Sequence, residues 1–183
     1  MLVEDIIKTV LKFMEKHDLI ASMQAGDVLV EDDATEVASY VNCLNLVRNE
    51  IATEFIPNAK TERLTVTDNR LDYTSFSSEV IEVLSVKNRL GESVKFDAFS
   101  DHIELENGTF EIKYNANPET LTLKSEFVSN IPERVYAYGI LREYYYIQTL
   151  YEDASVWDAR FKNSLQALER KKNETIIRKR GWF

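Results

Sequence analysis

Apolar residues recur at helical spacing in two segments of the first third of the chain. The stripe over residues 3–17 predicts an amphipathic helix, and a longer stripe with a period of 3.6 predicts a second helix over residues 34–55. Asp33, followed three residues later by a glutamate, is the predicted N-cap of the second helix. Residues 21–33 carry a glycine and a run of acids, so this segment is predicted to be a loop.

The apolar pattern of the middle of the chain changes to a period of two. Alternation over residues 103–114, with an Asn-Gly pair in the middle, predicts a β-hairpin closed by a type I′ turn. A second hairpin is predicted over residues 80–96, and shorter strands at 64–66 and 121–123. Six or so short strands at this spacing predict a small antiparallel sandwich or barrel-like module.

The last third returns to helical spacing and is rich in tyrosine. Pro132 opens a third helix, and six of the nine tyrosines of the chain lie within the sixteen residues 136–151. This helix is apolar around most of its circumference and must bury two faces. One of these faces is predicted either as core or as an interface between subunits, and it consists of Tyr136, Ile140, Tyr144, Ile147 and Tyr151. Asp153 then caps a predicted fourth helix.

These elements predict an α+β fold. A discontinuous antiparallel helical bundle, residues 1–60 and 128–183, carries an inserted antiparallel β module over residues 61–127. The strands lie between helical segments and do not alternate with helices, which disfavours a parallel sheet.

Charge is distributed unevenly along the chain. The net charge is −9, but residues 170–180 hold six cations and one acid, so the remaining residues carry −14. This acidic body argues against general nucleic-acid binding. The basic end is interpreted either as cations that complement a helix macrodipole or as a docking tail, which comprises Arg170, Lys171, Lys172, Arg178, Lys179, Arg180, Trp182 and Phe183.

The chain lacks the motifs that carry common chemistries. A single cysteine excludes an intramolecular disulfide and a cysteine-rich metal module, and Cys43 is predicted to be a small buried hydrophobe. On a strand, Asp101 and His102 would face opposite ways and could converge only at a bend, which disfavours a metal site. Glycine-rich phosphate loops and nucleophile elbows are absent from the sequence. We therefore expect no catalytic residues, no metal and no cofactor. No apolar run reaches the roughly 18 residues of a membrane span, so no membrane association is expected.

A recurring pattern in the last third resembles a known family. It consists of Ile131-Pro132-Glu133, Tyr138-Gly139-Ile140-Leu141, Tyr144-Tyr145, Asp153-Ala154, Trp157, Arg160-Phe161 and Ala167-Leu168. The pattern is similar to that of the head-to-tail connector (adaptor or neck) proteins of tailed bacteriophages, of the tail-tubular type that joins a helical bundle to a β module. The resemblance is best over residues 131–170, while the long β module departs from the smallest helical connectors.

The resemblance implies a structural virion protein without catalytic residues. Such a protein forms a homo-oligomeric ring, typically a dodecamer, at the neck between head and tail, and it is assembled in the host cytoplasm. Its implied partners are the portal protein and a tail or tail-adaptor protein, and double-stranded DNA passes through its channel without specific binding. The basic tail would then reach onto the portal. The alternative is a small glycan-binding or glycan-cleaving protein that uses exposed aromatic residues of the β module, such as Tyr73 and Tyr114.

Overall fold

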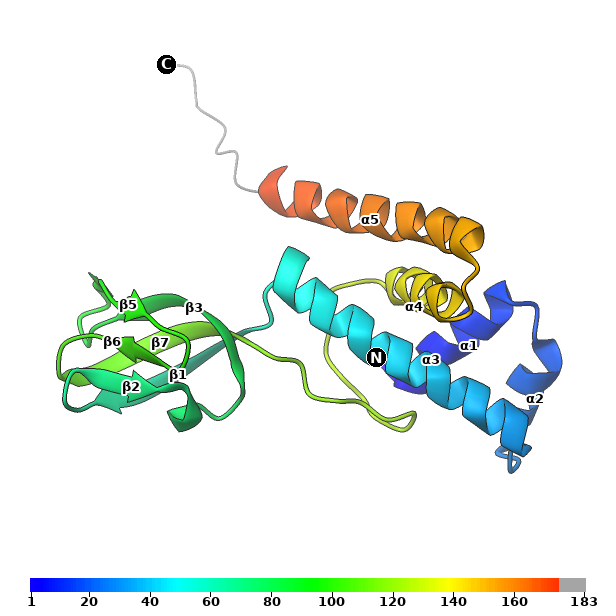
Figure 1. Cartoon of the computed structure of the whole chain (residues 1–183), viewed down its shortest axis with the longest axis horizontal. Coiled ribbons are helices and arrows are strands. Elements are labelled where there is room, and N and C mark those ends of the chain that lie inside the picture. Colours follow the sequence, from blue (N-terminus) through cyan, green and yellow to red (C-terminus); the bar gives the residue numbers. More distant parts are fainter. Residues whose placement is uncertain (175–183) are drawn as a thin grey trace, which may run out of the picture. The chain divides into compact units, whose positions relative to one another are not determined.

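The protein is described here by a computed structural model that covers residues 1–174, and the side chains of residues 1–170 (Figure 1). The chain divides into two compact units. The helical unit comprises residues 1–48 together with the described residues from 120 onward, and the β unit comprises residues 49–119. The two boundaries between the units, at residues 48/49 and 119/120, each lie earlier in the chain than the corresponding predicted boundary, at 60/61 and 127/128. The α+β fold class expected from the sequence is confirmed.

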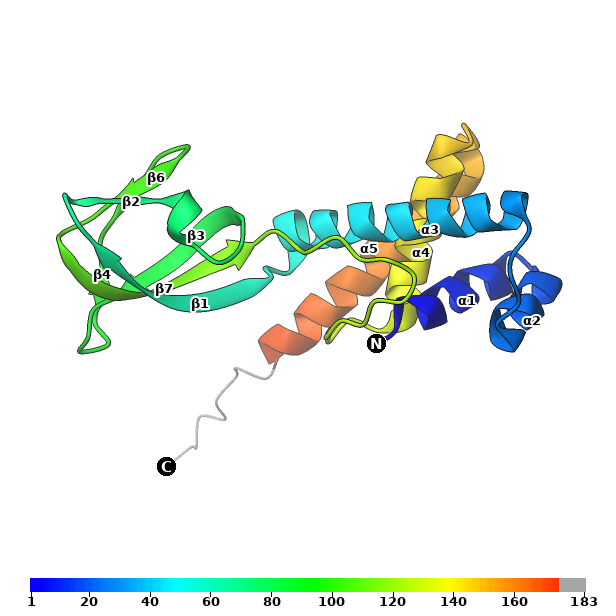
Figure 2. The ribbon, with the colours of Figure 1, turned by 90° about the horizontal axis from the view of Figure 1, so that it is seen from below.

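Five α-helices are described, all of which begin in the helical unit. They are α1 (Val3–Phe13), α2 (His17–Ala25), α3 (Glu31–Glu50), α4 (Glu133–Ile147) and α5 (Tyr151–Glu174). The helix α2 covers residues 21–25 of the segment predicted to be a loop and α3 covers residues 31–33, so the loop prediction is correct only for residues 26–30 (Figure 2). Only two residues of α2, Leu19 and Ile20, are buried, which is too few to give a periodic signal. The helix α3 begins at Glu31, before the predicted cap, and continues as a π-helical turn, Ile51–Phe55.

The core of the helical unit follows the apolar stripes. All five buried residues of α1 belong to the predicted stripe, namely Val3, Ile6, Ile7, Val10 and Leu11. Between the β unit and α4, Leu121 is buried and exchanges two hydrogen bonds with the side chain of Asn45 on α3, at 2.9 and 3.0 Å. The backbone groups of Leu121 are used in this way, so the predicted strand over residues 121–123 does not form.

The β unit contains seven strands in two antiparallel sheets. One sheet has the order β1-β7-β3-β4 and the other the order β2-β6-β5. The strands are β1 (Ala59–Val66), β2 (Arg70–Asp72), β3 (Val80–Lys87), β4 (Ser93–Val94), β5 (Asp97–Ala98), β6 (His102–Glu104) and β7 (Gly108–Ala116). The pairing of β3 with β4 confirms the predicted hairpin over residues 80–96. The two sheets do not close into a barrel.

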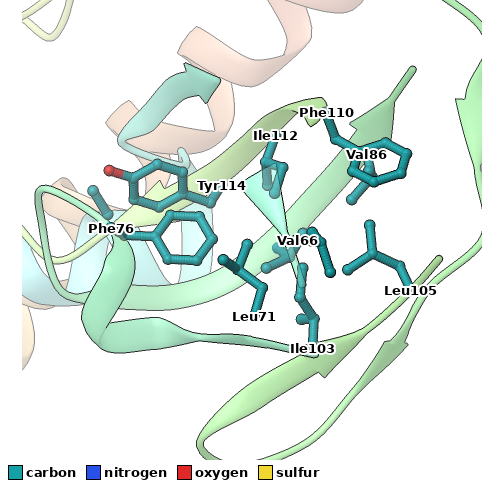
Figure 3. Packing of buried hydrophobic residues seen from close by; sticks show 11 residues of the cluster. Val66, Leu71, Phe76, Val86, Ile103, Leu105, Phe110, Ile112 and Tyr114 are labelled. Carbon is teal, nitrogen blue, oxygen red and sulfur yellow. The ribbon is translucent and has the colours of Figure 1, made fainter. Parts of the chain in front are cut away.

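The predicted hairpin over residues 103–114 does not form. The strand β7 pairs with β1 and β3, whereas β6 pairs with β2 and β5, so the Asn-Gly pair does not join two partners. The turn with two positive φ angles lies instead at Asp68 (56°) and Asn69 (58°), and it leads into β2. Side chains from both sheets share one core, in which Leu71 and Ile103 face Ile112 and Tyr114 (Figure 3).

Candidate functional site

Exposed apolar side chains gather where α4 turns into α5. Within six residues the chain exposes Tyr146 (42%), Ile147 (61%), Leu150 (48%) and Tyr151 (63%). We call these four residues the aromatic turn. The rings of Tyr146 and Tyr151 lie 6.3 Å apart, centroid to centroid. Contiguous exposed apolar side chains of this size are typical of a surface that binds another protein.

The backbone of the aromatic turn has a defined conformation. Thr149 has a φ of 60°, and the amide of Leu150 donates to the carbonyl of Tyr145 (2.9 Å), while the amide of Thr149 donates to that of Tyr146 (3.0 Å). This pair of hydrogen bonds around a left-handed residue is the Schellman ending of a helix. A β-branched residue is strained in this conformation, which glycine adopts freely. The turn is therefore held in one conformation at some cost in free energy.

A half-buried carboxylate connects α4 to α3 behind the aromatic turn. Glu36 accepts hydrogen bonds from Lys16 and from the hydroxyls of Tyr40 (2.6 Å) and Tyr144 (3.3 Å). Burial alone would raise the pKa of Glu36, but the hydrogen bonds from Lys16 and Tyr40 outweigh it, so this pKa lies below its ordinary value. Burial, and then the neighbouring carboxylate, raise the pKa of Tyr40. The network holds the last turns of α4 against α3.

A buried arginine connects α4 to α5. Arg142 Nη2 donates to Glu143 Oε1 (2.6 Å), and Arg142 Nη1 donates to Asp158 Oδ1 (3.4 Å). The guanidinium also lies 4.7 Å from the centroid of the Phe161 ring. The α4–α5 hairpin is thus fixed on both sides of its turn, which presents the exposed side chains on a rigid support.

The structure separates the five residues of the predicted interface face. Tyr136 and Ile140 are buried in the helical unit, Tyr144 is half-buried, and Ile147 and Tyr151 are exposed. Only the last two therefore share the aromatic turn. Sequence reasoning missed Tyr146 and Leu150, because neither residue lies on the helical face that was predicted to form the interface.

The predicted docking tail lies mostly outside the described part of the chain. Arg170 is exposed near the end of α5, and Lys171 and Lys172 follow in the same helix. Arg178, Lys179, Arg180, Trp182 and Phe183 lie outside the described residues.

The side chains of Asp101 and His102 lie close together in the β unit. His102 Nδ1 lies 2.7 Å from Asp101 Oδ1, because Asp101 sits in a bend immediately before β6. The two side chains converge at a bend, which the sequence indicated to be necessary for their convergence. The same cluster contains Arg70, which donates to Asp101 (2.9 Å). Among the described residues, no group of three histidine, cysteine or acidic side chains has the geometry to hold a metal ion.

Three further residues considered from the sequence are buried or half-buried. Cys43 is fully buried on α3, as predicted, and burial raises the pKa of its thiol to about 12. Tyr114 is also fully buried, with its hydroxyl donating to Glu62, and Tyr73 is half-buried. The expectation that Tyr114 is an exposed aromatic residue is therefore wrong.

Comparison with models of known protein families and with curated proteins finds no match for this chain. Within the described residues, every helix is too short or too polar to cross a bilayer.

Proposed function

We propose that this chain is a structural subunit of a bacteriophage neck. In this proposal, copies of the chain form a closed ring that joins the portal of the head to the tail, and the ring continues the DNA channel. The observation that carries the proposal is the aromatic turn, because a self-assembling subunit needs exposed apolar surface on a rigid support. The resemblance of residues 131–170 to connector proteins gives the direction of the proposal.

The distribution of charge supports the same function. The chain outside the basic end carries −14, and a wall of that sign repels phosphate. DNA would then pass through the ring without being held, as ejection requires. The basic end of the chain suits a different, acidic neighbour, for which the portal protein is the proposed partner.

The experiment is a mass measurement of the purified protein, alone and mixed with the portal protein of the same phage. A closed oligomer, formed alone or only on the portal, is the expected result. The double variant Ile147→Ser/Tyr151→Ser is expected to reduce assembly, because it removes the two most exposed side chains of the aromatic turn. Val128→Ser, at an exposed apolar residue of the helical unit away from this turn, is the matched control and is expected to assemble normally.

A chain that stays monomeric with and without the portal would contradict the proposed function. If the double variant still assembles, the proposal of a ring stands, but the aromatic turn is not part of the interface between its subunits.

A further inference from the structure

The outer face of the four-stranded sheet is basic in an otherwise acidic unit. The β unit holds fourteen acids and seven cations. Four of these cations, Arg63, Lys87, Arg89 and Lys113, share one face or its edge with two acids, Glu111 on that face and Glu92 in the same turn as Arg89. We call these four cations the basic face. Such segregation of charge is typical of a surface that recognises an acidic partner.

The register of the strands explains how the basic face arises. In β7 the buried residues Phe110, Ile112 and Tyr114 alternate with exposed ones, so Glu111 and Lys113 point away from the core. Residues directly opposite in an antiparallel pair share a face. Glu111 pairs with Arg63 on one side and with Lys87 on the other, which puts all three on the outer face. Within the described part of the chain, neither cation forms an ion pair with Glu111 shorter than 4 Å.

An apolar pocket adjoins the basic face. Arg89 lies in the β3–β4 turn and donates from Nη2 to Thr109 Oγ1 (3.3 Å). Beside it, a pocket of about 360 Å³ is lined by Leu90, Phe110 and the two paired threonines, Thr65 and Thr109. Leu90 is 82% exposed at the rim. The surface therefore offers cations and an apolar recess side by side.

Residues 27–33 of the helical unit present the complementary pattern. This segment comprises the end of the α2–α3 connection and the first turn of α3, and it carries four acids among seven residues. Two exposed valines lie between these acids, Val28 (98%) and Val30 (66%). An apolar side chain flanked by carboxylates matches a recess flanked by cations in both shape and charge.

We propose that the basic face and its pocket bind residues 27–33 of a second copy of this chain. A valine of that copy enters the pocket beside Leu90, and its acids lie against Arg63 and Arg89. The contact joins two different surfaces, so each copy can bind one neighbour on each side and a chain of copies closes into a ring. The inference deepens the proposed function and rests on it in one respect, namely that copies of the chain associate.

Duplex DNA is the less favoured occupant. Its phosphates suit the cations, but its backbone offers no apolar group for the pocket, and the net charge of −9 repels a polyanion at longer range. The experiment below distinguishes the two occupants.

The test is disulfide cross-linking between two separately purified single-cysteine variants, Val28→Cys and Leu90→Cys, one of which carries a mass tag. Because each chain has one introduced thiol, a mixed dimer reports only contact between copies. The native Cys43 is buried, and burial raises the pKa of its thiol to about 12, so it stays unreactive. The matched control replaces Val28→Cys with Val128→Cys, because Val128 is also a valine that is 98% exposed.

The mixed dimer of Val28→Cys with Leu90→Cys is expected to exceed the control by at least about fivefold. Adding Arg63→Glu/Arg89→Glu to the Leu90→Cys chain should remove that excess, and adding Asp27→Lys/Asp32→Lys to its partner should restore it. Lys124→Glu reverses one exposed charge on the helical unit and is expected to have no effect.

Equal yields of the mixed dimer with Leu90→Cys for Val28→Cys and Val128→Cys would contradict the proposed contact. Loss of duplex DNA binding in Arg63→Glu/Arg89→Glu, with the cross-link unchanged, would overturn it in favour of DNA. In either case a ring seen on the portal by mass measurement would leave the proposed function intact, whereas a strict monomer would remove the function itself.

Discussion

Gly139 of α4 lies so close to Val47 of α3 that a Cβ atom added at Gly139 would be 2.7 Å from Val47 Cγ1. The same atom would be 3.1 Å from Phe161 Cε2 of α5. Glycine is therefore required at this position by the close approach of three helices. The absence of a side chain at Gly139 allows the tyrosine-rich helix α4 to pack closely against α3 and α5.

We expect Gly139→Ala to lower the free energy of unfolding by about 1–3 kcal/mol, because the overpacking exceeds the gain in helix propensity. Urea unfolding followed by circular dichroism measures the change. Gln166→Ala, at an exposed position of α5, is the control and should stay within about 0.5 kcal/mol of the wild type. A Gly139→Ala protein as stable as the control would show that α3 and α4 are less closely packed than described.

We expect Thr149→Gly to raise the free energy of unfolding by about 0.5–1 kcal/mol. The substitution relieves the strain of a β-branched residue at a φ of 60°, and the greater freedom of glycine in the unfolded chain offsets part of the gain. Thermal unfolding measures the effect. Thr149→Val keeps a β-branched residue at the same φ and should bring no such gain. A lower melting temperature for Thr149→Gly would contradict this account of the turn.

Glu36 is expected to make the stability of the helical unit depend on pH in the acid range. Its pKa is lowered on folding, so its contribution is fully present above its ordinary pKa of 4.5 and is lost as the pH falls through the lower value of the folded state. The stability difference between wild type and Glu36→Gln should therefore be largest near neutral pH and shrink below about pH 4. Urea unfolding over a series of pH values tests this. Glu106→Gln, at an exposed position, is the control, and a difference that does not vary with pH would contradict the assignment.

Asn115→Asp is expected to destabilise the β unit by about 1–3 kcal/mol at pH 7. The buried Asn115 Nδ2 donates to the carbonyl of Ala52 (2.7 Å), while its Oδ1 accepts from the amide of Asn58 (2.8 Å). A carboxylate would set a negative oxygen against the carbonyl of Ala52. The penalty should shrink in acid, where the protonated group can donate again. Urea unfolding at pH 7 and in acid measures both, and Asn107→Asp, an exposed substitution of the same kind, should cost little.

The features that sequence predicted correctly are those with repeated local signals. The apolar stripe that begins at Val3 predicted α1. The apolar pattern over Val80–Lys87, with the turn that follows it, predicted the β3–β4 hairpin. The Asn-Gly pair at residues 107–108 led to a wrong hairpin prediction. It is a local signal, whereas β7 pairs with β1 and β3, which lie far from it in the sequence. Tertiary pairing outweighed turn propensity there.

Much of the candidate site could not be predicted from local sequence patterns. Thr149 occupies a position where glycine or asparagine is typical, so the Schellman ending of α4 could not be predicted from the residue type. Tyr136 and Tyr151 share a helical face by spacing, yet the first is buried and the second belongs to the next helix. The basic face likewise depends on which strands pair, since Arg63 and Lys87 meet only across β7.

The chain enters and leaves the β unit on two neighbouring strands, since Ala59 pairs with Asn115. This pairing has a consequence for the order of folding. Helices α3 and α4 must meet across the loop formed by residues 51–132, and closing a loop of about 80 residues costs about 4 kcal/mol of chain entropy. A β unit that has already folded shortens the free loop to residues 51–58 and 117–132, about 24 residues, and lowers that cost by about 1 kcal/mol. The β unit is thus expected to accelerate the assembly of the helices, and substitutions within it should slow their folding even where every helix contact is unchanged.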